Sequence, residues 1–251
     1  MMFHELLPPD MTLAETFALL GASFGTSFVT AAFGIGGGAL LIAILASVLP
    51  PAVLIPIHGI VQVGSNLGRA AIMLRHVEWS IIPAFVGGSV IGVALGGSIA
   101  VSIPPQAVQV GVGLFIIWSV FARPPGLFRK WAALTGAFSS FLTMFFGATG
   151  PFIASYVKTL TLGREAHVAT HSTLMTIQHV LKTIAFGFLG FAFGPWLPFV
   201  IAMIVFGFAG TVVGRQLLTR TTDGRFFWIL NAILLALAAR LIWTGAAGWF
   251  G

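Results

Sequence analysis

Long apolar stretches, separated by short turns, run through the whole chain. No Asp, Glu, Lys or Arg occurs between Glu15 and Arg69, or between Glu78 and Arg123, so Gly and Pro must mark several segment ends. Because a membrane-spanning helix takes about 20 apolar residues, the chain has room for about eight to ten membrane segments. The pattern predicts helical segments at 13–33, 38–49, 51–74, 79–101, 106–122, 131–147, 151–162, 165–190, 196–218 and 226–245. We therefore expect an all-α polytopic membrane protein that forms one domain over residues 1–251.

Two of these segments are too short to span a membrane comfortably. The segments 38–49 and 151–162 each follow a Gly-rich break, FGIGGG at 33–38 and FGATGP at 146–151. Gly has little helical preference, and Pro cannot donate the helical hydrogen bond. The breaks therefore predict broken or re-entrant helices near the membrane midplane.

The two breaks also indicate an internal duplication. Aligning the second half on the first pairs Phe33 with Phe146, Gly34 with Gly147, Gly37 with Gly150, His58 with His171 and Arg69 with Lys182. After a short insertion, the alignment also pairs Gly92 with Gly210 and Gly96 with Gly214. We expect a first repeat over about 13–122, a basic cytoplasmic linker at 123–130 and a second repeat over about 131–245. Five segments in each repeat is an odd number, so the second repeat should be inverted in the membrane.

The distribution of basic residues predicts the orientation of the chain. Lys and Arg occur in the turn 75–78, the linker 123–130, the turn 163–165 and the stretch 215–225. The turns at 50, 102–105 and 191–198 contain neither residue. Because cytoplasmic loops carry an excess of Lys and Arg, the first set should be cytoplasmic and both termini should be periplasmic.

Composition and charge exclude several classes of protein. Of the 251 residues, 58% are hydrophobic and only 7% are charged, against about 25% charged in a soluble domain. The net charge of +6 comes from basic residues that never form a run, which excludes a nucleic-acid-binding surface. The absence of Cys excludes disulfides, a thiolate metal site and a Cys nucleophile.

Two segments carry a polar stripe inside otherwise apolar sequence. The polar residues recur three or four positions apart, which places them on one face of a helix. The first stripe comprises His58, Gln62, Ser65, Asn66 and Arg69, and the second comprises His171, Gln178, His179 and Lys182. Because polar groups that face lipid are costly, both stripes should face the protein interior or a wet cavity.

The charge of this interior favours anions. Arg69 and Lys182 are the expected interior cations, whereas the six acidic residues all fall at segment ends or in loops. Broken helices also offer free backbone N–H groups near the midplane, where transporters built from inverted repeats bind their substrates. The break residues expected to contribute are Gly34, Gly36, Gly37, Gly38, Gly147, Thr149 and Gly150. We expect these groups, with the two polar stripes, to bind a small anion.

Other roles are open for some of the same residues. The glycines would also allow close packing of helices, and His58 and His171 would serve as hydrogen-bonded packing residues. His167, His171 and His179 lie at metal-ligand spacing on one helix, so a divalent-metal transporter or sensor is the alternative function. No interior carboxylate completes such a site, and no Ser lies in a recognisable hydrolase motif. We therefore expect no resident metal or cofactor, and no enzyme activity.

Three stretches resemble the sulfite exporter TauE/SafE family, also called the toluene sulfonate uptake permease family. They are FGIGGGALLIAIL in the first repeat, RHVEW at the end of the third helix, and GATGPFIASYVKTLTLGREAHVATHS in the second repeat. The resemblance covers roughly residues 13–245. It implies a bacterial inner-membrane transporter of small sulfur-containing anions such as sulfite, thiosulfate or organosulfonates. This chain departs from the family pattern in the less Gly-rich second break and in the His residues of its third helices.

Together these observations predict a secondary transporter that moves a sulfur oxyanion by alternating access. The histidines raise proton coupling as a further hypothesis, because the pKa of an ordinary His is near physiological pH. The expected partners are the anion and the lipid bilayer, with no nucleic acid. Assembly into a homo-oligomer is left open by the sequence.

Overall fold

The computed structural model covers most of the chain. The residues that it describes are 8, 11–34, 36–100, 102–121, 126, 130–216 and 224–250. Most of the expected linker 123–130, the acidic residues before position 11, residue 35 of the first break and Arg220 lie outside the described residues.

The described residues form ten α-helices joined by short turns, and no strand. The α-helices are α1 (Leu13–Phe33), α2 (Gly37–Leu45), α3 (Pro51–Ile72), α4 (Ile82–Ala100), α5 (Pro105–Phe121), α6 (Ala132–Phe146), α7 (Gly150–Thr159), α8 (Arg164–Phe188), α9 (Leu197–Arg215) and α10 (Gly224–Phe250). Short 3-10 turns precede α4 and α9: η1 (Leu74–His76), η2 (Trp79–Ile81) and η4 (Gly194–Trp196). The all-α prediction is confirmed. The largest departures are that α2 ends before the expected position 49 and that α10 continues beyond 245.

The lengths of the helices fit a polytopic membrane protein. Among the described residues, four helical stretches are long and apolar enough to cross a membrane: Leu13–Phe33, Trp79–Ala100, Gly194–Arg215 and Trp228–Trp249. α3 and α8 have 22 and 25 residues, or about 33 and 38 Å of helix, but their polar stripes make them less apolar. α2 and α7, with 9 and 10 residues, are shorter than the roughly 20 residues that a span needs.

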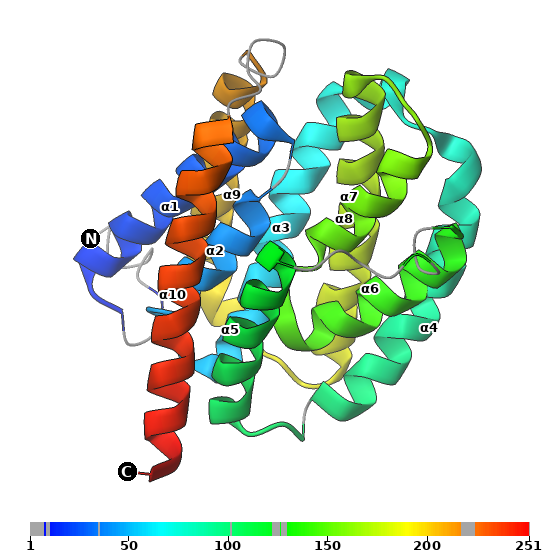
Figure 1. The fold of residues 1–251 in the computed structure, drawn as a ribbon. Helices are drawn as coiled ribbons and strands as arrows, with labels where there is room; N and C mark the ends of the chain where they lie inside the picture. The colour runs from blue at the N-terminus through cyan, green and yellow to red at the C-terminus, as the bar shows by residue number, and fades with distance from the viewer. Residues whose placement is uncertain are drawn as a thin grey trace.

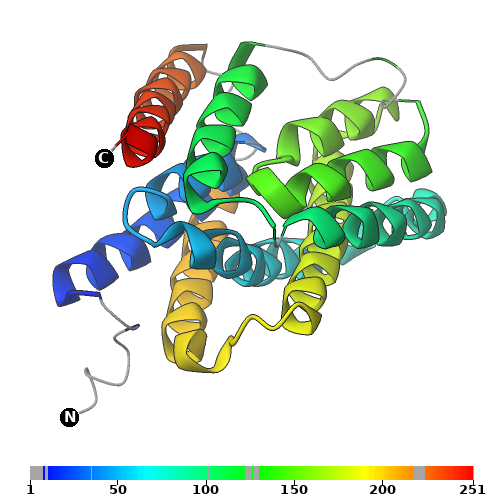
Figure 2. The same cartoon turned by 90° about the horizontal axis from the view of Figure 1, so that it is seen from below.

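Close helix pairs are made possible by glycine. α1 packs along α9, and α4 packs along α6. A methyl group added at Gly210 of α9 would overlap the backbone carbonyl of Phe24 in α1, and one added at Gly92 of α4 would overlap the carbonyl of Ala137 in α6. Only glycine therefore allows either pair to approach so closely. α5 packs along α10, and Figure 2 shows α10 at one edge of the molecule with α5 beside it.

α3 and α8 cross the middle of the molecule side by side (Figure 1). Gly59, near the start of α3, lies against Lys182, near the end of α8. Arg69, near the end of α3, bonds to Ser172, near the start of α8. The two helices therefore run antiparallel. We call the side where α3 begins and α8 ends the Pro51 face, and the opposite side the Ile72 face.

Stacked aromatic rings hold α5 against the second break. Phe146, the last residue of α6, stacks on Phe115 of α5 with ring centroids 4.9 Å apart. Phe152, in the first turn of α7, stacks on Trp118 of α5 at 5.0 Å. Since these contacts fix the chain on both sides of residues 147–149, the break has a defined position next to the core.

Candidate functional site

The first break depends on glycines with unusual backbone angles. α1 is capped at its end by Gly34, whose φ of 87° is left-handed and whose N–H donates to the carbonyl of Thr30 at 2.8 Å. Gly36 has a φ of 106°, which also favours glycine. A side chain at Gly37 would overlap the backbone carbonyl of Thr26. The chain can therefore end α1, turn and begin α2 within a few residues, close against α1.

The second break is built in a similar way. α6 is capped at its end by Gly147, which has a φ of 70° and donates its N–H to the carbonyl of Thr143 at 3.3 Å. α7 then begins at Gly150, with Pro151 in its first turn. A side chain at Gly147 would collide with Ile42 of α2, so the second break lies directly against α2, which follows the first break. The two breaks are thus brought together.

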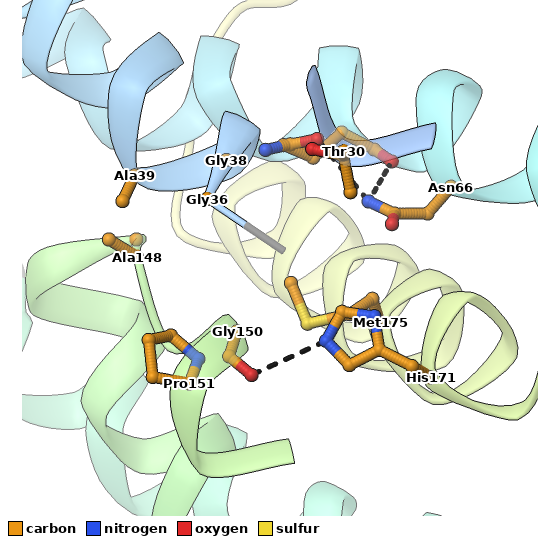
Figure 3. Close-up of a pocket in the computed structure, with 12 residues that line it drawn as sticks. Thr30, Gly36, Gly38, Ala39, Asn66, Ala148, Gly150, Pro151, His171 and Met175 are labelled. Carbon is orange, nitrogen blue, oxygen red and sulfur yellow. Dashed lines mark hydrogen bonds between the residues drawn. The ribbon is translucent and has the colours of Figure 1, made fainter. Parts of the chain in front are cut away.

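A pocket lies between the two breaks and the central helices; we call it the central pocket (Figure 3). Its walls come from the end of α1, the start of α2, the middle of α3, the second break, the start of α7 and the middle of α8. The residues that line it are Thr30, Gly36, Gly38, Ala39, Gln62, Asn66, Gly147, Ala148, Gly150, Pro151, His171 and Met175.

Helix starts face this pocket. α2 and α7 both begin without a side chain that caps their first turn. The first N–H groups of a helix have no partner inside the helix and give its start a partial positive charge. Pro151 has no N–H, so α2 offers more of these donors than α7 does. Such helix starts are favourable places for an anion.

Two histidines fasten the short helices to the long ones. His58 Nε2 of α3 lies 3.2 Å from the carbonyl of Gly38 in α2. His171 Nε2 of α8 lies 3.3 Å from the carbonyl of Gly150 in α7, as Figure 3 shows. A carbonyl can only accept, so a ring nitrogen that bonds to it is the donor. His58 Nε2 also lies 3.3 Å from the amide nitrogen of Gln62, which can only donate, so His58 makes one of these two bonds in each tautomer. Each central helix therefore fixes the start of the short helix that precedes it.

Arg69 lies behind the pocket wall. Asn66 lines the pocket, and its side-chain oxygen accepts a bond from Arg69 Nη1 at 3.1 Å. Arg69 also donates to the hydroxyls of Ser65 and Ser172, each at 3.4 Å. Arg69 is only 2% exposed. It therefore holds Asn66 in place and brings a positive charge close to the pocket.

Lys182 lies on the other side of the pocket region, towards the Pro51 face. Its side chain is fully buried, and Nζ has no hydrogen-bond partner among the described residues. His179, one turn earlier on α8, has no partner for either ring nitrogen within the same part of the chain. Its ring meets that of His58 edge to face, with centroids 5.6 Å apart.

The structure divides the predicted site residues into two sets. Those that line the central pocket are Gly36, Gly38, Gln62, Asn66, Gly147, Gly150 and His171. Those that lie outside its wall are Gly34, Gly37, His58, Arg69, Thr149, Gln178, His179 and Lys182. Gln178 donates to the hydroxyl of Thr149 and so holds the second break from behind.

Sequence reasoning missed five residues of the pocket wall. They are Thr30, Ala39, Ala148, Pro151 and Met175. Ala148 and Pro151 lie within the second break, and the predicted alignment of the two halves pairs Met175 with Gln62. Because Gln62 was a predicted site residue, this pairing could have identified Met175 as a pocket residue as well.

The buried charges near the site are positive. Among the described residues, the charged side chains that are buried are Arg69 and Lys182. The three described acids lie at helix starts or turns and are not buried. Glu78 accepts bonds from the backbone and hydroxyl of Ser80, which lower the pKa of its carboxyl. In the same part of the chain, no three His, Asp or Glu side chains form a group that could hold a metal ion, so nothing there supports the alternative metal site.

Comparison with protein families places the chain. A model of the family described as Sulfite exporter TauE/SafE matches residues 19–241, which include both breaks and the central helices. The chain belongs to the sulfite exporter TauE/SafE family. No curated protein and no solved structure matches it. TauE/SafE is a family of membrane transporters, so this chain is a multi-pass membrane transport protein whose family is linked to the export of a sulfur anion.

Proposed function

We propose that this TauE/SafE protein is a secondary transporter that carries small sulfur-containing anions, of the sulfite, thiosulfate or organosulfonate class, by alternating access. The observation that carries the proposal is the central pocket, where two uncapped helix starts meet beside a buried cation. Sulfite and sulfonate groups present several acceptor oxygens. Backbone N–H groups and amide side chains such as those of Gln62 and Asn66 donate to acceptors of this kind.

Positive charge without a buried acid supports an anion rather than a cation. The guanidinium of Arg69 is held 3.1 Å from the oxygen of Asn66, directly behind the pocket wall. Charges that are taken out of water interact more strongly than charges at a surface. An anion in the pocket would therefore be attracted by Arg69, and a metal cation would be repelled by it.

We infer that 13–122 and 131–245 are inverted repeats. In the predicted alignment, Gly92 is equivalent to Gly210, and Ala137 is equivalent to Phe24. The close approach of Gly92 to the carbonyl of Ala137 is then the counterpart of the approach of Gly210 to the carbonyl of Phe24. The left-handed ends of α1 and α6, at Gly34 and Gly147, are equivalent in the same way. This agreement supports alternating access by movement of one repeat against the other.

We further propose that the Ile72 face is cytoplasmic, that both termini are periplasmic and that the membrane is the inner membrane of a bacterium. At the Ile72 face the turn after α3 carries Arg75, and its His76 lies 3.3 Å from Glu165 at the start of α8. Lys158, near the end of α7, and Arg164, at the start of α8, belong to the same region of the chain. This excess of basic residues supports a cytoplasmic location.

The first test is ligand-dependent thermal stability of the purified protein in detergent. A ligand that binds only the folded state at 100 times its Kd adds about 2.7 kcal/mol of stability. We expect sulfite, thiosulfate or an organosulfonate to raise the melting temperature, with sulfate, chloride, Zn²⁺ and Ni²⁺ as comparisons. Arg69→Gln should weaken the effect, whereas Arg75→Gln, an exposed Arg at the Ile72 face, should leave it unchanged.

Flux measurements in proteoliposomes complete the test. The anion that stabilises the protein should cross the membrane only when the protein is present. Stabilisation by Zn²⁺ or Ni²⁺ alone would refute the anion proposal. Proton coupling is a separate part of the proposal, and flux that ignores an imposed pH gradient would contradict it.

A further inference from the structure

Lys182 and His179 form a buried polar group that the central pocket does not use. Both side chains are 0% exposed. Within the described part of the chain, Lys182 Nζ and both ring nitrogens of His179 lack a hydrogen-bond partner. Burying polar groups without partners is costly, and the cost is higher for a charged group. Two such residues next to each other on one helix indicate a place where a ligand supplies the missing partners.

The chemistry of this group selects an anion. An ammonium group carries only donors, and a neutral imidazole always carries one N–H, so His179 has a free donor in either tautomer. The acids of the described residues are not buried and none accepts from Lys182. The required partner is therefore a molecule with acceptor atoms and a negative charge.

Glycine makes room for the end of Lys182. A methyl group added at Gly59 of α3 would lie 2.7 Å from Lys182 Cε and 3.5 Å from Nζ. Any larger residue at this position would push the ammonium group aside. The amine is thus positioned by the crossing of α3 and α8, independently of the two breaks.

His58 separates this group from the central pocket. Its Nε2 bonds to Gly38, which lines the pocket, and its ring contacts that of His179 at 5.6 Å between centroids. One imidazole ring therefore lies between the pocket wall and His179. The His58 ring is thus in contact with both the pocket wall and the group formed by Lys182 and His179.

An apolar cavity lies one helical turn away from Lys182, in the direction of the Pro51 face. It has a volume of about 440 Å³, and its lining includes Ile55 of α3 and Phe186 of α8. Ile55 is one turn from Gly59, and Phe186 is one turn from Lys182 on the same helix face. An anion that enters through this cavity would meet the ammonium group before it reaches the central pocket.

We propose that Lys182 and His179 form a second anion-binding site, the Lys182 station, which the transported anion occupies between the Pro51 face and the central pocket. The proposal rests on the proposed function and adds a second position for the same substrate. It predicts that Lys182 controls the affinity for anion presented at one face of the membrane only.

Sided transport tests this proposal. The protein is inserted into vesicles in a single orientation, and the half-saturating concentration of sulfite is measured from the Pro51 face and from the Ile72 face. Lys182→Gln should raise the value at the Pro51 face by about tenfold or more, because it removes a charge-assisted hydrogen bond. The value at the Ile72 face should stay unchanged. Gly59→Ala, which keeps the charge but displaces it, should raise the value at the Pro51 face by a smaller factor.

Matched variants make the outcome decisive. Lys158→Gln makes the same change at an exposed position of α7 and should alter neither value. Melting temperature in detergent checks that each variant folds. An equal rise at both faces, or no change at either face in folded Lys182→Gln, would overturn the Lys182 station and leave the central pocket intact. If the wild-type protein neither binds nor transports sulfite or another sulfur anion, the proposed function itself fails.

Discussion

Replacing Gly92 or Gly210 with Ala should loosen two helix contacts that we infer to be equivalent. The added methyl group would overlap a backbone carbonyl of the facing helix, that of Ala137 for Gly92 and that of Phe24 for Gly210. A backbone atom cannot rotate away, so the helices have to separate. Overpacking of this kind costs about 1–3 kcal/mol, and the better helix propensity of Ala returns roughly 0.5–1 kcal/mol.

The net loss of about 1–2 kcal/mol corresponds to a fall in melting temperature of roughly 2–8 °C for a chain of this size. Thermal unfolding in detergent measures it. Gly87→Ala and Gly25→Ala are matched controls, because a methyl group at either position has nothing within 4 Å. These controls should unfold at or slightly above the wild-type temperature. If Gly92→Ala and Gly210→Ala melt at the same temperature as the controls, the helices do not approach as closely as we describe. If only one of them is destabilising, the equivalence of the repeats fails.

Three further changes have defined outcomes. Asn66→Ala removes a pocket side chain that Arg69 holds, so the sulfite concentration that gives half of the thermal stabilisation should rise by about tenfold. Ser172→Ala removes the acceptor that α8 offers to Arg69, and the melting temperature without ligand should fall by about 2–4 °C, for a loss of roughly 1 kcal/mol. Because Ser80 lowers the pKa of Glu78, Glu78 stabilises the folded state above its unfolded pKa. Glu78→Gln should therefore be less stable than wild type near neutral pH, and melting curves should converge as the pH falls through the lowered pKa.

Helix positions could be predicted from the sequence because the signals that end helices are local. Pro51 begins α3, and the glycines at 34 and 147 end α1 and α6 in left-handed conformations that other residues rarely adopt. The polar stripe on one helix face also predicted that Arg69 and Lys182 lie in the interior, and both residues are buried.

The composition of the pocket could be predicted only in part. A stripe on one helix face fixes which way side chains point, but not which of them reaches a cavity that five other segments help to form. Arg69 lies behind Asn66, and His58 bonds to Gly38 instead of facing the pocket. Thr30 and Met175 line the pocket although neither belongs to a break or was expected to bind. These outcomes depend on how the helices pack, which local sequence does not specify.

The bonds of Arg69 also bear on how the protein is made. An Arg in a membrane-spanning helix makes insertion less favourable, by about 2.5–3.5 kcal/mol at the helix centre and by less towards the end, where Arg69 lies in α3. Its partner on α8, Ser172, follows 103 residues later in the chain. At a synthesis rate of about 5–20 residues per second, that partner emerges roughly 5–20 s after Arg69 does. Asn66 and Ser65 are on the same helix as Arg69 and accept from it. α3 therefore carries its own partners for the guanidinium during the interval in which the second half of the protein does not yet exist.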